Sequence, residues 1–167
     1  PTFLREQGLD PLRYLVAFNG AAIVGIALWG RASEGAIGRR GAVTLAALSG
    51  VGLAPLFLTT SSTALLLVGA LAMGATGGGI WGMAPAYLTE RFPTAVRGVG
   101  PGLSYHVGAA VGSATPLVLG QLQDGGMTIA GATTLSIVAS GLVVAAVIWL
   151  GPETRGRHFT AVDEVQT

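Results

Sequence analysis

Four side chains in this sequence could do chemistry in a nonpolar environment. Asn19 is the single asparagine, His106 is the one histidine in a long uncharged stretch, Tyr105 precedes it, and Trp81 lies in another such stretch. A titratable or strongly polar side chain in an apolar helix usually faces a solute pathway, although a histidine or asparagine can simply hydrogen-bond a neighbouring helix. We therefore predict that Asn19, Trp81, Tyr105 and His106 line a polar pathway. The alternative is that these side chains only pack between helices, and this interpretation is strongest for Trp81.

The elements that must hold these residues are apolar helices of membrane length. Of the 167 residues, 51% are hydrophobic and 10% are charged, whereas soluble domains carry about 25% charged residues. A helix crosses an apolar layer of about 30 Å with ~20 residues, and the Thr/Ser cluster at 59–63 divides the longest uncharged stretch. The sequence predicts an all-α integral membrane protein with five spans, near 12–30, 41–58, 64–88, 98–122 and 127–150. His106 lies about 12 Å into the fourth span at the helical rise, near the middle of the bilayer.

Several function classes are excluded by composition. The chain has no cysteine and a formal net charge of +1, so it offers no thiolate metal site and no basic field for nucleic acid. HExxH, GxSxG and paired acids within a span are absent, and this argues against an enzyme, a metal site or a cofactor. Gly77, Gly79 and Gly82 match the spacing GxGxxG of dinucleotide-binding loops. They lie inside an apolar span, however, without the preceding strand that such a loop requires.

All nine basic residues are arginines, and their distribution predicts the orientation. Only Arg5 and Arg13 lie on one side of the predicted spans. The seven on the other side are Arg31, Arg39, Arg40, Arg91, Arg97, Arg155 and Arg157. Because cytoplasmic loops of membrane proteins are enriched in arginine and lysine, we predict a multi-pass protein in a lipid bilayer with a cytoplasmic C-terminus.

Small residues recur every four positions in two of the predicted spans. One series is Gly74, Gly78 and Gly82, and the other is Ser104, Gly108 and Gly112. Apolar surface alone gives helices in lipid little reason to associate, so such faces supply the close packing between them. We predict that both series are helix–helix contacts.

Three patterns in the loops resemble the major facilitator superfamily. The first is Gly30-Arg31-Ala32-Ser33-Glu34 followed by Gly38-Arg39-Arg40, similar to the family's Gly-x-x-x-Asp/Glu and Gly-Arg-Arg/Lys loop. The second is the run from Tyr87 to Gly98, which resembles the Glu-x-Phe-Pro-Thr-x-x-Arg-Gly loop between helices ten and eleven. The third is Pro152-Glu153-Thr154-Arg155-Gly156, similar to the ending of many such transporters. The first loop departs from the pattern, because three residues separate Glu34 from Gly38 where two are usual.

The resemblance implies the C-terminal half of a major facilitator fold. Residues 1–150 would form the end of helix seven and helices eight to twelve, and residues 151–167 a cytoplasmic tail. The opening Pro1-Thr2-Phe3-Leu4 lacks an initial Met and reads as the end of an earlier helix. The missing N-terminal half would then be a partner, and the location would be the plasma membrane, in a bacterium the inner membrane.

The same resemblance assigns a role to the loops. They would form a cytoplasmic gate whose ion pairs break when the two halves rock apart. Its residues would be Gly30, Glu34, Gly38, Arg39, Arg40, Glu90, Arg97, Glu153 and Arg155. The alternative is that the arginines serve only to orient the chain in the membrane.

The stretch from Gly102 to Ala109 resembles the carboxylate branch of proton symporters, which includes lactate-type and sialate-type permeases. This implies secondary active transport of a small organic carboxylate together with protons. No arginine or lysine lies within a span, so a cation for the carboxylate would have to come from helix seven or the missing half. Sugar, aromatic-acid and drug carriers of the same fold stay open, as does a membrane subunit without transport activity. The substrate, coupling ion and direction are not determined by the sequence.

Overall fold

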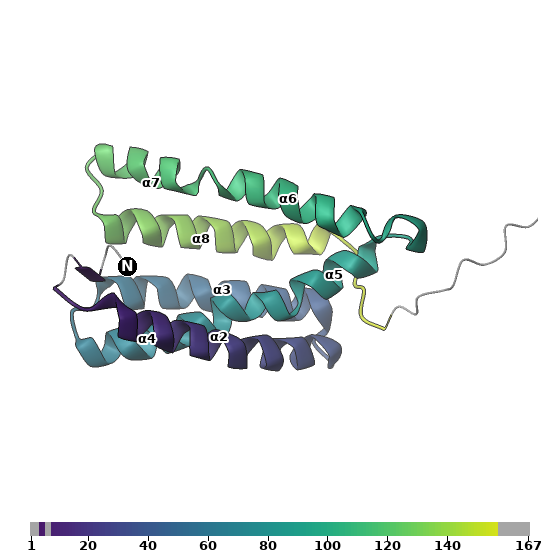
Figure 1. Ribbon diagram of the computed structural model, residues 1–167, viewed down its shortest axis with the longest axis horizontal. Helices are drawn as coiled ribbons and strands as arrows, with labels where there is room; N and C mark the ends of the chain where they lie inside the picture. The colour runs from purple at the N-terminus through teal and green to yellow at the C-terminus, as the bar shows by residue number, and fades with distance from the viewer. Residues whose placement is uncertain (1–3, 6–7, 157–167) are drawn as a thin grey trace, which may run out of the picture.

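The computed structural model describes residues 4, 5 and 8–156, and its regular elements are helices (Figure 1). No strand occurs among these residues. The longer helices are α2 (Pro11–Glu34), α3 (Gly38–Thr59), α4 (Thr63–Gly77), α5 (Ala84–Arg91), α6 (Gly100–Gly112), α7 (Thr115–Asp124) and α8 (Ile129–Val147). Three short 3₁₀ segments complete them: η1 (Gly78–Gly82), η2 (Thr94–Val96) and η3 (Ile148–Leu150).

Four stretches are long and apolar enough to cross a membrane. They are Pro11–Glu34, Gly38–Thr59, Thr63–Arg91 and Ile129–Leu150, with 22 to 29 residues each. These correspond to the first, second, third and fifth predicted spans. Side-chain caps mark the starts of two of these helices. The Asp10 side chain accepts a hydrogen bond from the Leu12 N–H at the start of α2, and the Thr128 side chain accepts one from the Gly131 N–H at the start of α8. The all-helical membrane fold predicted from the sequence is therefore confirmed, and the chain is a multi-pass membrane protein.

The fourth predicted span is divided into two shorter helices, α6 and α7, which follow one another along the same direction (Figure 1). The break at Ser113 and Ala114 precedes Pro116, which lies in the first turn of α7. Proline has no N–H for the preceding turn and disfavours a helical conformation in the residue before it. The Ser113 N–H still bonds to the Ala109 carbonyl oxygen at 2.9 Å, so the two pieces stay joined end to end.

The third span also changes its helical form. After α4 the chain tightens into η1 over Gly78–Gly82, and it resumes as α5 with Pro85 in its first turn. Glycine destabilises a helix interior and proline removes a hydrogen-bond donor, which accounts for the 3₁₀ segment at this point. Trp81 is therefore presented from the irregular segment η1.

Glycines bring α2 very close to α4 and η1. A Cβ atom added at Gly25 would meet the Ala75 backbone, one at Gly74 the Phe18 carbonyl oxygen, and one at Gly82 the Ile26 carbonyl oxygen. The Trp29 indole N–H also crosses this interface and donates to the Ala75 carbonyl oxygen at 3.0 Å. The first predicted series of small residues thus forms a helix–helix contact.

The second series lies on an open face. Helix α3 packs against α2, α4 and α8, whereas α6 and α7 lie on the far side of α8 (Figure 1). Nothing among the described residues would come within 4 Å of a Cβ atom added at Gly108 or Gly112. A contact for this series is therefore not part of the described bundle. The predicted end of a sixth helix falls before Asp10, where residues 4, 5 and 8–10 are described.

Candidate functional site

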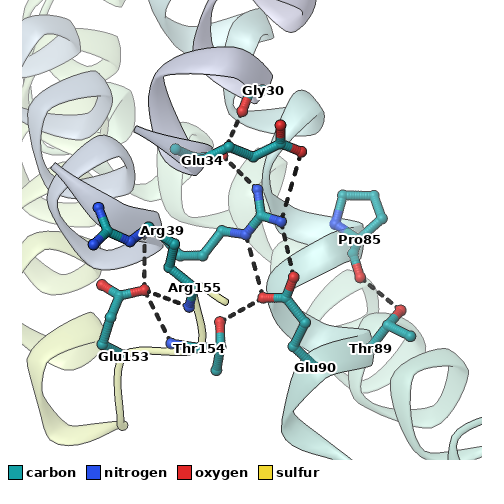
Figure 2. A network of polar contacts seen from close by, with 10 residues as sticks. Gly30, Glu34, Arg39, Pro85, Thr89, Glu90, Glu153, Thr154 and Arg155 are labelled. Carbon is teal, nitrogen blue, oxygen red and sulfur yellow. Dashed lines mark hydrogen bonds and ion pairs between the residues drawn. The ribbon is translucent and has the colours of Figure 1, made fainter. Parts of the chain in front are cut away.

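Polar side chains gather at one end of the bundle, around Arg39 at the start of α3 (Figure 2). The Arg39 Nη2 donates to Glu90 Oε1 at 2.8 Å, and its Nε donates to Glu90 Oε2 at 3.2 Å. The two side chains are only 10% and 11% exposed. Glu90 lies near the end of α5, so this two-pronged ion pair joins the second and third spans.

The loop between α2 and α3 completes the surroundings of the Arg39 guanidinium. Its Nη1 donates to the Ser33 hydroxyl at 2.6 Å, and that hydroxyl donates to the Gly30 carbonyl oxygen at 2.7 Å. The Glu34 carboxylate lies 4.0 Å from Nη2, but its side chain is 72% exposed. Glu34 is therefore a loosely held member of the cluster, and Ser33 is a closer one.

Glu153 binds the start of α3 through main-chain donors. Its Oε1 accepts the Arg39 N–H at 3.0 Å and its Oε2 accepts the Arg40 N–H at 3.1 Å. These are N–H groups of the first helical turn, which lack partners in the helix and favour an anion. Gly38 has a φ of +68°, and its missing side chain leaves the space that the carboxylate occupies. We expected Glu153 in an ion-pair network, and the structure places it as a helix cap.

The pKa of Glu153 reflects this arrangement. Partial burial of the carboxylate raises the pKa, but hydrogen bonds from the N–H groups of Arg155, Arg40, Arg39 and Thr154 outweigh it. The net result is a pKa below the ordinary value for glutamate. The charged carboxylate is thus the form that holds the C-terminal segment against α3.

The residues after Glu153 fasten the C-terminal segment to two further elements. The buried Thr154 hydroxyl donates to Glu90 Oε2 at 2.6 Å, and an Arg155 guanidinium nitrogen donates to the Gly35 carbonyl oxygen. Residues 153–155 therefore touch α3, α5 and the loop between α2 and α3 at once. We call residues 30–40, Glu90 and 153–155 the polar cluster.

The remaining arginines predicted for the gate are Arg40, whose side chain points to the edge of the polar cluster, and Arg97, which lies outside it. The Arg40 guanidinium stacks over the Trp149 ring at 4.2 Å from its centroid and donates to the Trp149 carbonyl oxygen at 3.3 Å. The Arg97 guanidinium donates to the Phe92 carbonyl oxygen at 3.3 Å, within the loop that follows α5. Arg157 lies outside the described residues.

The predicted pathway residues lie farther along the bundle, on a face shared by α2, η1 and α6. Asn19 and Trp81 line a hollow of about 420 Å³ together with Phe18, Ile26, Gly77 and Gly78. The Asn19 amide nitrogen donates to the Leu15 carbonyl oxygen at 2.7 Å, so its amide oxygen is not used in that bond. Trp81 is 54% exposed.

Helix α6 brings the other two predicted residues next to this hollow. The ring centroids of Tyr105 and Trp81 lie 5.8 Å apart with a tilt of 59°, and the His106 ring lies edge-on to Tyr105. The His106 Nδ1 is 2.7 Å from the Gly102 carbonyl oxygen. Because a carbonyl oxygen can only accept, this contact assigns the hydrogen to Nδ1 and leaves Nε2 as the nitrogen that can gain a proton.

Two members of the polar cluster were not predicted from the sequence. Ser33 and Thr154 are both fully buried, and each hydroxyl meets one partner of the Arg39–Glu90 pair. Serine and threonine are common near helix ends and carry no spacing signature of their own. Only their position inside the loop motifs could have indicated that Ser33 and Thr154 belong to the polar cluster.

Comparison with known proteins connects the chain to bacterial transporters. It is 30% identical over 118 residues, 71% of its length, to NiaP of Bacillus subtilis, whose name proposes niacin and nicotinamide as its substrates. It is 32% identical over 130 residues, 75% of its length, to the cis,cis-muconate transport protein of Acinetobacter baylyi. The chain spans about 30% of the length of these relatives.

No family model and no solved structure matches the chain. Both relatives are named as transport proteins and neither as an enzyme. The long apolar helices, the polar cluster built from the three loop motifs and these two relatives agree with one another. The chain is thus similar to bacterial transport proteins and is consistent with a fragment of the major facilitator superfamily, which its loop motifs resemble.

Proposed function

We propose that this chain is the C-terminal half of a transporter that moves a small organic carboxylate across the plasma membrane together with protons. The observation that carries the proposal is the hollow beside Asn19 and Trp81, flanked by Tyr105 and His106. There, polar and aromatic side chains from three separated segments, α2, η1 and α6, come together. The names of the two relatives support the substrate class, because niacin and muconate are both carboxylates, whereas nicotinamide, also in the first name, is a neutral amide.

His106 supplies a route for coupling the proton to the anion. With its hydrogen on Nδ1, the neutral ring offers Nε2 as an acceptor, which would repel a carboxylate. A proton on Nε2 turns that nitrogen into a charged donor and would attract a carboxylate. Proton and substrate would then each strengthen the binding of the other, as linkage requires.

The polar cluster would serve this transport cycle as a gate on the cytoplasmic side. It ties α3, α5 and the C-terminal segment into one unit. The cluster would hold one conformation of this half, and the exposed Glu34 would be able to meet the opposite half. Arg97→Ala is expected to lower the transport rate at unchanged abundance in the membrane, and an unchanged rate would leave only an orienting role.

Uptake into proteoliposomes tests the function. The full-length transporter is reconstituted, and uptake of radiolabelled nicotinate, muconate, lactate and glucose is measured with and without an inward proton gradient. We expect uptake of at least one carboxylate, stimulated by the gradient, and none of glucose. Uptake of glucose alone would favour a sugar carrier of the same fold, and uptake of none would favour a membrane subunit without transport activity.

The His106→Gln variant separates coupling from packing. Glutamine keeps the ability to hydrogen-bond but does not titrate. In the wild type, substrate affinity should strengthen as the pH falls, and the variant should lose that dependence. If the two pH profiles coincide and the variant transports normally, His106 is structural and the proton is carried elsewhere.

A further inference from the structure

A second hollow opens at the arginine-rich end, between α5, α6 and α8. Its volume is about 500 Å³. The walls are mainly apolar and include Leu88, Phe92, Val143, Val144, Val147 and Ile148. Val143 lies two turns before the end of the last span at Leu150, so the hollow runs about 11 Å into the bilayer at the helical rise. We call it the α5–α8 groove.

Arg91 stands at the mouth of the α5–α8 groove. It belongs to the last turn of α5 and reaches across to Gly151, where any side chain would collide with its guanidinium. Its Nη1 donates to the Tyr87 hydroxyl at 2.8 Å, and the guanidinium lies 5.5 Å from the Tyr87 ring centroid. Neither ion pair found among the described residues involves Arg91. This cation is therefore positioned by a neutral phenol, and no carboxylate among the described residues forms an ion pair with it.

The end of the bundle around Arg91 carries an excess of positive charge. The described residues there include six arginines, at 31, 39, 40, 91, 97 and 155, against three glutamates, at 34, 90 and 153. The two glutamates that are held most firmly face Arg39 and the start of α3. On the other side of η3, Arg40 stacks over Trp149 and likewise takes part in neither ion pair. The surroundings of the groove mouth thus favour an anion.

The level of the groove mouth in the bilayer indicates which anion. Trp149, which is 55% exposed, lies at the end of the last span next to the groove residues Ile148 and Leu150. Tryptophan and arginine side chains at a span end lie at the depth of the lipid headgroups. An anion at that depth with a hydrocarbon chain pointing inward would fill both the mouth and the walls.

We propose that the α5–α8 groove binds an anionic phospholipid. The phosphate would accept hydrogen bonds from the Arg91 guanidinium, which presents paired donors suited to phosphate oxygens. One acyl chain would lie along the valines of α8 and Leu88 of α5. The lipid would thereby contact α5, whose Glu90 belongs to the polar cluster, and would link membrane composition to that end of the protein.

Spin-labelled lipids test the site in the intact transporter. The protein is reconstituted in phosphatidylcholine containing trace spin-labelled phosphatidylglycerol or phosphatidylcholine, and the motionally restricted fraction is measured. We expect a saturable preference for phosphatidylglycerol that falls about fivefold in Arg91→Gln, the effect of one basic residue at an anionic surface. The matched control is Arg31→Gln, which removes the same charge from the end of α2 and should leave the preference unchanged.

A second variant addresses the acyl chain. Val144→Trp fills the α5–α8 groove without altering charge and should also abolish the saturable preference. The proposal is wrong if the wild type does not prefer phosphatidylglycerol, if Arg91→Gln and Arg31→Gln lower the preference equally, or if Val144→Trp has no effect. Displacement of the labelled lipid by inorganic phosphate alone would contradict it as well, since that result would assign the site to a free anion.

Discussion

The two series of small residues differ in whether another helix packs closely against them. Along α4 and η1, Gly74 and Gly82 lie so close to α2 that no side chain would fit, while a Cβ atom added at Gly108 or Gly112 of α6 would meet no other described segment within 4 Å. We call α2–α5 with residues 152–156 the packed side, and α6–α7 the open side. The same spacing of small residues occurs on both sides.

The difference shows what such spacing can and cannot indicate. A small-residue face permits close approach, but a contact forms only where another helix presents a matching backbone. On the packed side α2 supplies that backbone, and hydrogen bonds such as Trp29 to Ala75 follow. On the open side Tyr105 and His106 remain available to a solute or to further helices. The packed side therefore provides rigidity, and the open side adds Tyr105 and His106 to the face that we assign to transport.

The largest effect should come from the ion pair of the packed side. Arg39→Ala leaves Glu90 almost buried without its partner, and removing one member of a buried pair costs on the order of 3 kcal/mol. We expect a loss of about that size in the free energy of unfolding in detergent micelles. Ser104→Ala is the control from the open side, because its hydroxyl donates only to the Gly100 carbonyl oxygen of its own helix. Equal losses in both variants would contradict the comparison.

Glycine substitutions probe the two series directly. In Gly74→Ala the new methyl group meets the Phe18 carbonyl oxygen, and overpacking of this kind costs about 1–3 kcal/mol. Gly108→Ala should be neutral or should stabilise α6 by up to about 1 kcal/mol, since alanine is the better helix former. Thermal unfolding of both variants measures the difference. If Gly108→Ala destabilises as much as Gly74→Ala, another helix covers α6 and the open side is not open.

Acid should release the C-terminal segment from the packed side. The pKa of Glu153 is lowered in the docked segment, so its contribution is present above the pKa of the undocked glutamate, about 4.3. The contribution is lost as the pH falls through the lowered value. We expect the stability difference between wild type and Glu153→Gln to be constant from pH 8 to about 5 and to shrink below about 4. A difference that grows on acidification would mean that protonated Glu153 makes the contact.

The smallest effect is expected at the break on the open side. Pro116 lies in the first turn of α7, where a missing N–H leaves no helical bond unmade. Pro116→Ala should therefore change the free energy of unfolding by no more than about 0.5 kcal/mol, as for substitutions away from packed features. A larger gain would show that the break is held against a strong tendency to form one continuous helix.

The membrane helices could be predicted closely from the sequence. Charge-free stretches bounded by arginines and Thr/Ser or Gly turns fixed the first, second, third and fifth spans to within about four residues. The division of the fourth span was missed, although Pro116 was its signal, because hydropathy does not change at a helix break. In the same way, the glycines of Gly78–Gly82 indicated the irregular segment η1.

The sequence predicted which residues belong to the candidate site better than it predicted which atoms contact one another. Arg39, Glu90 and Glu153 stand in the loop motifs, but which atoms meet depends on contacts between positions 39, 90 and 153 that no local pattern encodes. Glu153 therefore caps a helix where an ion pair was expected, and Arg40 stacks on Trp149. The close placement of Trp81 and Tyr105 also needed the fold, because the two residues lie in different spans and Trp81 belongs to the irregular segment η1.

The central claim is that the face shared by α2, η1 and α6 lines the solute pathway. The chain contains no cysteine, so single cysteines can be placed at Asn19 and Tyr105 once any cysteines in the rest of the transporter are replaced, with Leu45→Cys, at a position 48% exposed on α3, as the control. The measurement is the rate of modification by a membrane-impermeant thiol reagent, with and without a transported carboxylate. We predict that Asn19→Cys and Tyr105→Cys react and are protected by the carboxylate, whereas Leu45→Cys does not react. Equal reactivity at all three positions, or no protection by any transported carboxylate, would contradict the assignment.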